Sequence, residues 1–165
     1  MDIPFELETL QFLWYIVFAA AIFAYAALDG FDIGVGCLHL FAKTDYDRRI
    51  FLNAIGPVWD SNSLWVIISA GALLAGFPKA FSLLLSTLYI PMLFLVFGYL
   101  ARGVAMEFRS KMSGPKWRTC WDMVFSLASF SLAFGFGVTL ANLVQGLPIN
   151  QDGELVGGVA ALFPP

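Results

Sequence analysis

Of the 165 residues, 59% are hydrophobic and only 13% are charged, whereas roughly a quarter of the residues in soluble domains are charged. The composition predicts an integral membrane protein and argues against an ordinary soluble domain. A net charge of -3 leaves no basic surface for nucleic acid, and the two cysteines, Cys37 and Cys120, lack the spacing of a metal site or disulfide framework.

The first apolar run covers residues from about 10 to 41 and is long enough to cross a bilayer at about 1.5 Å per residue. Acidic residues precede it where a cleaved signal peptide would be basic, so we expect the helix to be retained. Near its end, Asp29 and Asp32 are three apart and share a face, while Gly30 and Gly34 allow close approach of another helix. We expect the two carboxylates to point into protein.

Three further apolar runs predict helices over residues from about 56 to 77, 80 to 101 and 119 to 144. Residues 43–49 read as a polar loop, and Pro91 should kink the third helix. The fold class is therefore all-α: a polytopic membrane protein, built as a single antiparallel four-helix transmembrane bundle. Residues 145–165 read as an external tail or the start of a second half. In the fourth helix, small residues recur every four positions and predict a helix-packing stripe: Ser129, Ala133, Gly137 and Ala141.

The basic residues predict the orientation of these helices. Cytoplasmic loops of membrane proteins carry an excess of Lys and Arg. Of the nine basic residues, only Lys79 falls outside the first and third connections and their flanks. We therefore expect these two connections to be cytoplasmic and both termini external. The other eight basic residues are Lys43, Arg48, Arg49, Arg102, Arg109, Lys111, Lys116 and Arg118.

Asp60 lies at the mouth of the second apolar run. A carboxylate at full membrane depth costs about 2.5–3.5 kcal/mol on insertion scales, and less near the interface. Two interpretations stay open: a proton-relay carboxylate that exchanges protons with the cytoplasm, or a helix-start residue that pairs with Arg102. Trp59 beside it suits packing or interfacial anchoring.

Other ionisable residues gather at the same helix ends. Asp29 and Asp32 could extend the relay, or could pair structurally with Arg48, Arg49 or Arg102. We interpret four further residues as ion-pair or structural groups: Arg102, Glu107, Arg109 and Asp122. His39 is the only histidine, so no bis-histidine haem site can form within the chain, and we expect a lone interfacial histidine with no metal or haem bound directly.

Several motifs together resemble subunit II of the cytochrome bd-type quinol oxidases. The motifs are ordered, correctly spaced and spread over nearly the whole chain. They lie in residues 28–36, which contain Asp29-Gly30-Phe31-Asp32, and in residues 48–49, 56–65, 71–75, 102–109 and 117–122.

The resemblance implies a multi-pass subunit of the bacterial inner membrane, without catalytic residues of its own, in a complex that oxidises quinol and reduces oxygen to water. Its partner, subunit I, would carry two b-type haems, one d-type haem and the quinol site. Trp59 and Asp60 match a Trp-Asp pair proposed to bring cytoplasmic protons toward the haems, and Asp32 with Asp29 matches a second acidic motif. Membrane lipids, quinone and a small accessory subunit complete the expected partners.

Family members are about twice as long, with two related four-helix halves. Three explanations stay open: a separate second half, a truncated sequence, or a second copy of this chain. The alternative function is a small proton or ion transporter, or a membrane assembly module without redox activity. The absence of repeated broken helices makes a self-contained transporter less attractive.

Overall fold

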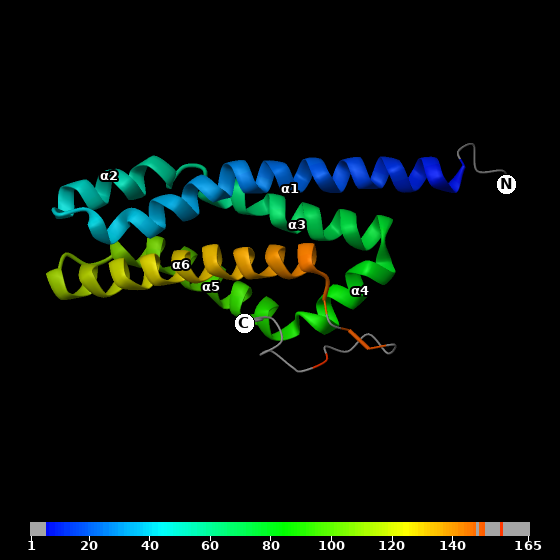
Figure 1. Cartoon of the computed structure of the whole chain (residues 1–165). Helices are drawn as coiled ribbons and strands as arrows, with labels where there is room; N and C mark the ends of the chain where they lie inside the picture. Colours follow the sequence, from blue (N-terminus) through cyan, green and yellow to red (C-terminus); the bar gives the residue numbers. More distant parts are fainter. Residues whose placement is uncertain (1–5, 148, 151–155, 157–165) are drawn as a thin grey trace.

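The computed structural model describes residues 6–147, 149–150 and 156, and this part of the chain is almost entirely helical (Figure 1). Its elements, in chain order, are α1 (Leu7–Leu38), the 3-10 turn η1 (His39–Phe41), α2 (Asp45–Ile55), α3 (Trp59–Gly76), α4 (Pro78–Thr87), α5 (Tyr89–Arg109) and α6 (Pro115–Gln145).

Three stretches are long and apolar enough to cross a membrane: α1 together with η1, α5, and α6. The pair α2 and α3 also meets this test, with a bend of 48° between the two helices, which makes up to four spans. These helices confirm the predicted all-α, polytopic membrane fold.

The helices associate as two pairs, α1 with α3 and α5 with α6, and contacts between α1 and α6 join the pairs. Two small apolar clusters fill the centre, one around Ile33, Leu95 and Leu132 and one around Ile55 and Phe125. Many large apolar side chains point outward instead. A surface of this kind suits lipid or another membrane subunit, because neither requires apolar groups to be hidden.

The predicted polar loop over residues 43–49 is largely helical in the structure. The Thr44 hydroxyl accepts a hydrogen bond from the backbone N–H of Asp47 at 3.1 Å, so it caps the start of α2 at Asp45. The second predicted helix begins at Trp59 rather than at residue 56, because the chain turns over residues 56–58. A separate helix, α2, therefore precedes α3.

The third predicted helix, residues 80–101, divides into α4 and α5 at Leu88. Pro91 lies in the first turn of α5, where a missing N–H donor leaves no helical hydrogen bond unmade. In place of a kink at the proline, the helix is interrupted at Leu88, three residues before Pro91. The spanning helix α5 continues to Arg109, and α6 begins at Pro115, another first-turn proline.

Close helix contact uses different small residues from those expected. A Cβ atom on Gly36 would lie 2.5 Å from Cβ of Ser129, and the Ser126 hydroxyl donates to the Gly36 carbonyl at 2.7 Å. Gly36 therefore lets α1 and α6 touch. Gly30 and Gly34 have open space at the Cβ position. Of the predicted stripe, Ser129 is buried, whereas Ala133, Gly137 and Ala141 are exposed.

We predict that Gly36→Ala separates α1 from α6 and destabilises the chain by about 1–3 kcal/mol, because the added methyl group overpacks the contact with Ser129. Gly30→Ala is the matched control on the same helix, and it should be neutral or stabilising by up to about 1 kcal/mol. Thermal unfolding of the purified chain in a mild detergent measures both. Equal melting temperatures for the two variants would contradict the assigned contact.

Candidate functional site

A buried ion pair joins α1 to α5. Asp29 has 0% and Arg102 has 1% of its side-chain surface exposed, and Arg102 Nη2 donates to Asp29 Oδ1. The Tyr99 hydroxyl donates to Asp29 Oδ2 at 2.9 Å. From α3, the Ser63 hydroxyl lies 3.1 Å from Asp29 Oδ1 and 2.9 Å from Arg102 Nη2. One carboxylate thus ties three helices together.

The same buried region extends to Asp32 and Tyr25. Asn62 Nδ2 donates to Asp32 Oδ2 at 2.9 Å, and the hydroxyls of Tyr25 and Tyr99 are hydrogen-bonded to each other. Within the described residues, Asp32 Oδ1 and two Arg102 nitrogens, Nε and Nη1, are buried without a hydrogen-bond partner. We call this set, Tyr25, Asp29, Asp32, Asn62, Ser63, Tyr99 and Arg102, the inner network.

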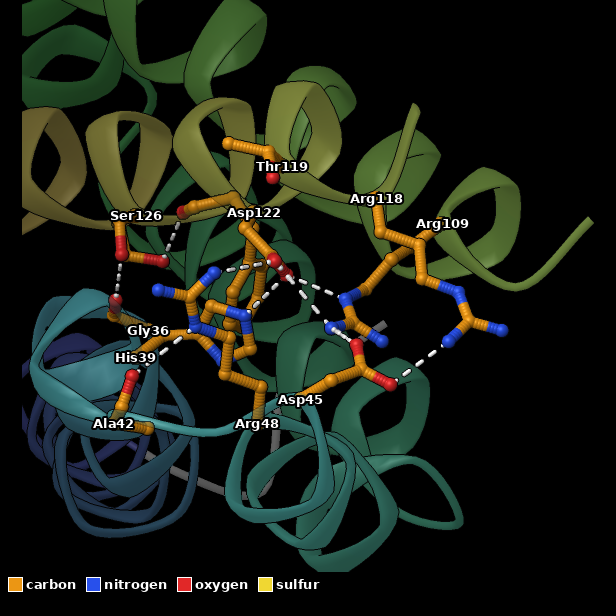
Figure 2. Close-up of polar contacts among 12 residues, drawn as sticks. Gly36, His39, Ala42, Asp45, Arg48, Arg109, Arg118, Thr119, Asp122 and Ser126 are labelled. Carbon is orange, nitrogen blue, oxygen red and sulfur yellow. Dashed lines mark hydrogen bonds and ion pairs between the residues drawn. The ribbon is translucent and has the colours of Figure 1, made fainter. Parts of the chain in front are cut away.

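A second polar cluster surrounds Asp122 at the end of the molecule where α2 and the α5–α6 connection lie (Figure 2). Asp122 Oδ1 lies 2.6 Å from His39 Nε2, Asp122 Oδ2 accepts from Arg48 Nη1 at 3.0 Å, and Arg109 Nε donates to Oδ1. Asp45 accepts from Arg109 Nη2 and from Arg118 Nη1, each at 2.8 Å. We call these six residues the Asp122 cluster.

His39 is not the interfacial histidine that we expected. It is completely buried, and the Phe125 ring packs edge-to-face against the imidazole, with the two ring centroids 5.1 Å apart. The reason is that η1 packs against α6, so the imidazole meets Asp122. Sequence reasoning missed this pair, because the two residues are 83 positions apart. The only signal in the sequence for this pair was that both residues lie near the connections rich in Lys and Arg.

Arg102, Arg109 and Asp122 lie in ion pairs in the structure, whereas Glu107 does not among the described residues. Glu107 and Asp60 are both exposed and make no hydrogen bond or ion pair with the described part of the chain. Arg102 therefore pairs with Asp29 rather than with Asp60. Trp59, beside Asp60, packs against α5, because a Cβ atom on Gly103 would lie 3.1 Å from its ring.

The described residues contain no group of three or more His, Cys, Asp or Glu side chains that could hold a metal ion. The His39 imidazole is engaged through Nε2 by Asp122, and its Nδ1 is buried without a hydrogen-bond partner. The site is thus a set of paired charges, hydroxyls and carboxylates. Groups of this kind can fix helices together and can exchange protons.

We predict that Arg102→Gln or Asp29→Asn alone destabilises the chain by about 3–5 kcal/mol, because each leaves a buried charge without its partner. The double variant should lose less than the sum of the two single variants, since both charges are then absent. Yield of monodisperse protein and thermal unfolding in detergent measure the effect. Strictly additive losses would show that the two residues do not depend on each other.

We predict a comparable loss, about 3–5 kcal/mol, for Asp122→Asn, which leaves Arg48 and Arg109 without their shared carboxylate. Glu107→Gln removes a charge of the same sign from an exposed, unpaired position and should change stability by less than about 0.5 kcal/mol. Chemical denaturation in mixed detergent compares the two. A similar loss in both variants would mean that net charge, not pairing, matters.

Comparison with known proteins gives the chain a family. The family model of the cytochrome bd terminal oxidase subunit II matches residues 10–165. Cytochrome bd-I ubiquinol oxidase subunit 2 of Escherichia coli (strain K12) is 36% identical over 148 residues, which is 89% of this chain and 39% of that protein.

Two other relatives are also named as subunit 2 of a cytochrome oxidase. Cytochrome bd ubiquinol oxidase subunit 2 of Bacillus subtilis (strain 168) is 38% identical over 147 residues, 88% of this chain and 44% of that protein. A probable cytochrome oxidase subunit 2 of Haemophilus influenzae is 33% identical over 146 residues, 88% of this chain and 39% of that protein. The chain therefore spans less than half the length of these relatives. Since the family model matches nearly all of its residues, the chain belongs to the cytochrome bd terminal oxidase subunit II family.

Proposed function

We propose that this chain acts as a non-haem subunit of a cytochrome bd-type quinol oxidase in the bacterial inner membrane. In this role it supports a haem-bearing subunit I and contributes a cytoplasmic proton pathway for the reduction of oxygen to water. The family and the relatives named as ubiquinol oxidase subunits support the first part. The arrangement of polar side chains around α3 supports the second.

One observation carries the proton pathway: α3 presents an exposed carboxylate and buried polar contacts within its first turns. Asp60 is exposed, while Asn62 and Ser63 hydrogen-bond to Asp32 and Asp29 inside the bundle. A proton taken up at Asp60 would therefore start within one helical turn of Asn62 and Ser63, the two α3 residues that contact the buried carboxylates. Water or a neighbouring subunit would complete the step from Asp60 inward.

Within the inner network, the two buried carboxylates, Asp29 and Asp32, have different sets of hydrogen-bond partners. Arg102 offsets the charge of Asp29, and three hydrogen bonds occupy the Asp29 oxygens. Asp32 has one amide contact, and its Oδ1 is without a hydrogen-bond partner among the described residues. Asp32 is thus the better candidate to accept and release a proton, and Asp29 the better candidate to hold the helices in place.

The outward face of the bundle is consistent with the proposed role of supporting subunit I. Large apolar side chains on α1, α5 and α6 are exposed, for example Phe23, Phe94 and Phe134. In a complex, part of this surface would pack on subunit I and the remainder on lipid. The eight basic residues near the first and third connections favour a cytoplasmic position for the Asp122 cluster and for Asp60.

We predict that Asp60→Asn and Asp60→Ala lower quinol oxidase turnover about tenfold or more in complexes with normal haem content, because proton delivery then limits the reaction. Glu107→Gln is the matched control, since Glu107 is also an exposed carboxylate without a partner in the described chain. Oxygen consumption per haem, measured across pH, tests this.

Unchanged turnover of both Asp60 variants at every pH would reject the pathway through Asp60. A loss of haem content with normal turnover per haem would assign Asp60 to assembly instead. Equal losses in Asp60→Asn and Glu107→Gln would indicate a general effect of surface charge.

A further inference from the structure

A cavity of about 250 Å³ adjoins the Asp122 cluster. It lies between the start of α2 and the beginning of α6, beside the connections that precede these helices. Its lining is mostly polar or charged, and several of the residues appear in Figure 2. They are Lys43, Asp45, Arg48, Ser113, Pro115, Arg118, Thr119 and Asp122.

The charges in and directly behind the lining are unequal. Four are cationic, Lys43, Arg48, Arg109 and Arg118, and two are anionic, Asp45 and Asp122, which leaves a net charge of plus two. The carboxylates are already engaged, because Asp122 is shared by Arg48, Arg109 and His39, and Asp45 by Arg109 and Arg118. An anion in the cavity would therefore meet excess positive charge rather than free carboxylates.

Hydrogen-bond donors also remain available there. Lys43 and Ser113 line the cavity, are exposed, and make no hydrogen bond or ion pair with the described part of the chain. Arg118 uses Nη1 for Asp45, whereas its Nε is buried without a partner among the described residues. The cavity lining thus includes an ammonium group and a hydroxyl that no described acceptor engages, and a guanidinium with one N–H left without a partner.

The cavity lies where a membrane span ends. Pro115 in its lining is the first residue of α6, a helix long and apolar enough to cross the membrane. Trp117 and Trp121, which pack together with their ring centroids 5.6 Å apart, follow within two turns. Tryptophan is enriched at the headgroup level of a bilayer, so the lining should face the region that holds lipid phosphates.

We infer that this cavity binds a phosphate group, presented by an anionic phospholipid headgroup or as free phosphate. Its volume equals that of roughly eight water molecules at about 30 Å³ each, which accommodates a phosphate with part of a glycerol. Basic pockets beside membrane helices bind anionic headgroups by the same chemistry. The inference does not depend on a proton pathway through Asp60.

Native mass spectrometry tests the lipid source. The full chain, with every subunit that co-purifies, is reconstituted in nanodiscs of mixed phosphatidylcholine and phosphatidylglycerol and then released into mild detergent. We expect retained phosphatidylglycerol, and about fivefold weaker retention in Lys43→Gln. Lys111→Gln is the matched control, because Lys111 is an exposed lysine that does not line the cavity.

A thermal-shift arm tests free phosphate. The same protein, in phosphatidylcholine only, receives sodium phosphate or sodium chloride at equal ionic strength. A phosphate-specific shift that Lys43→Gln removes, without retained phosphatidylglycerol, would assign the site to free phosphate. Equal retention of both lipids together with no phosphate-specific shift would overturn the inference, as would equal effects of Lys43→Gln and Lys111→Gln.

Discussion

The ion pair between Asp29 and Arg102 is the interaction on which the helix arrangement depends. Both side chains are fully buried in helices that can cross a membrane, where an unpaired charge costs about 2.5–3.5 kcal/mol even on insertion scales. The Asp29 carboxylate belongs to α1, the Arg102 guanidinium to α5 and the Ser63 hydroxyl to α3, so the pair fixes three helices at one point. The charges would be costly in any arrangement that separated them.

The Asp122 cluster repeats this design about three turns farther along α1. His39 is ten residues beyond Asp29, about 15 Å along a helix, and brings η1 into contact with α6. Arg48 and Asp45 add α2, and Arg109 adds α5. Charged groups are thus buried inside the bundle and apolar groups point outward, which is the inverse of a soluble helical protein. Such an arrangement suits a chain inserted in a membrane, where lipid can cover the apolar side chains.

Composition and apolar run length were sufficient to predict the membrane helices, because a span must satisfy its backbone internally and so reveals itself by length. Arg102 was among the predicted partners of Asp29, but the sequence could not choose among three arginines, since that choice depends on how α1 and α5 cross. The break at Leu88 and the burial of His39 depend on tertiary contacts in the same way. Ala133, Gly137 and Ala141 show that a small-residue stripe indicates a possible contact face without naming its partner.

The polar residues at the start of α3 are the structural basis of the proposed proton pathway. Asp60 is exposed without a partner in the described chain, whereas the nearby Asn62 and Ser63 reach the buried carboxylates. A purely structural helix start would not require this juxtaposition. An exposed carboxylate beside a buried polar network is an arrangement suited to proton exchange between water and the interior of a membrane complex.

The most direct test of the account is a reduced-minus-oxidised absorption spectrum of the complex purified gently through a tag on this chain, with the co-purifying proteins identified by mass spectrometry. The account predicts b-type and d-type haem bands together with a larger haem-bearing partner. A preparation that stays colourless across several mild detergents, although the tagged chain is folded, would contradict a role as the non-haem subunit of a quinol oxidase.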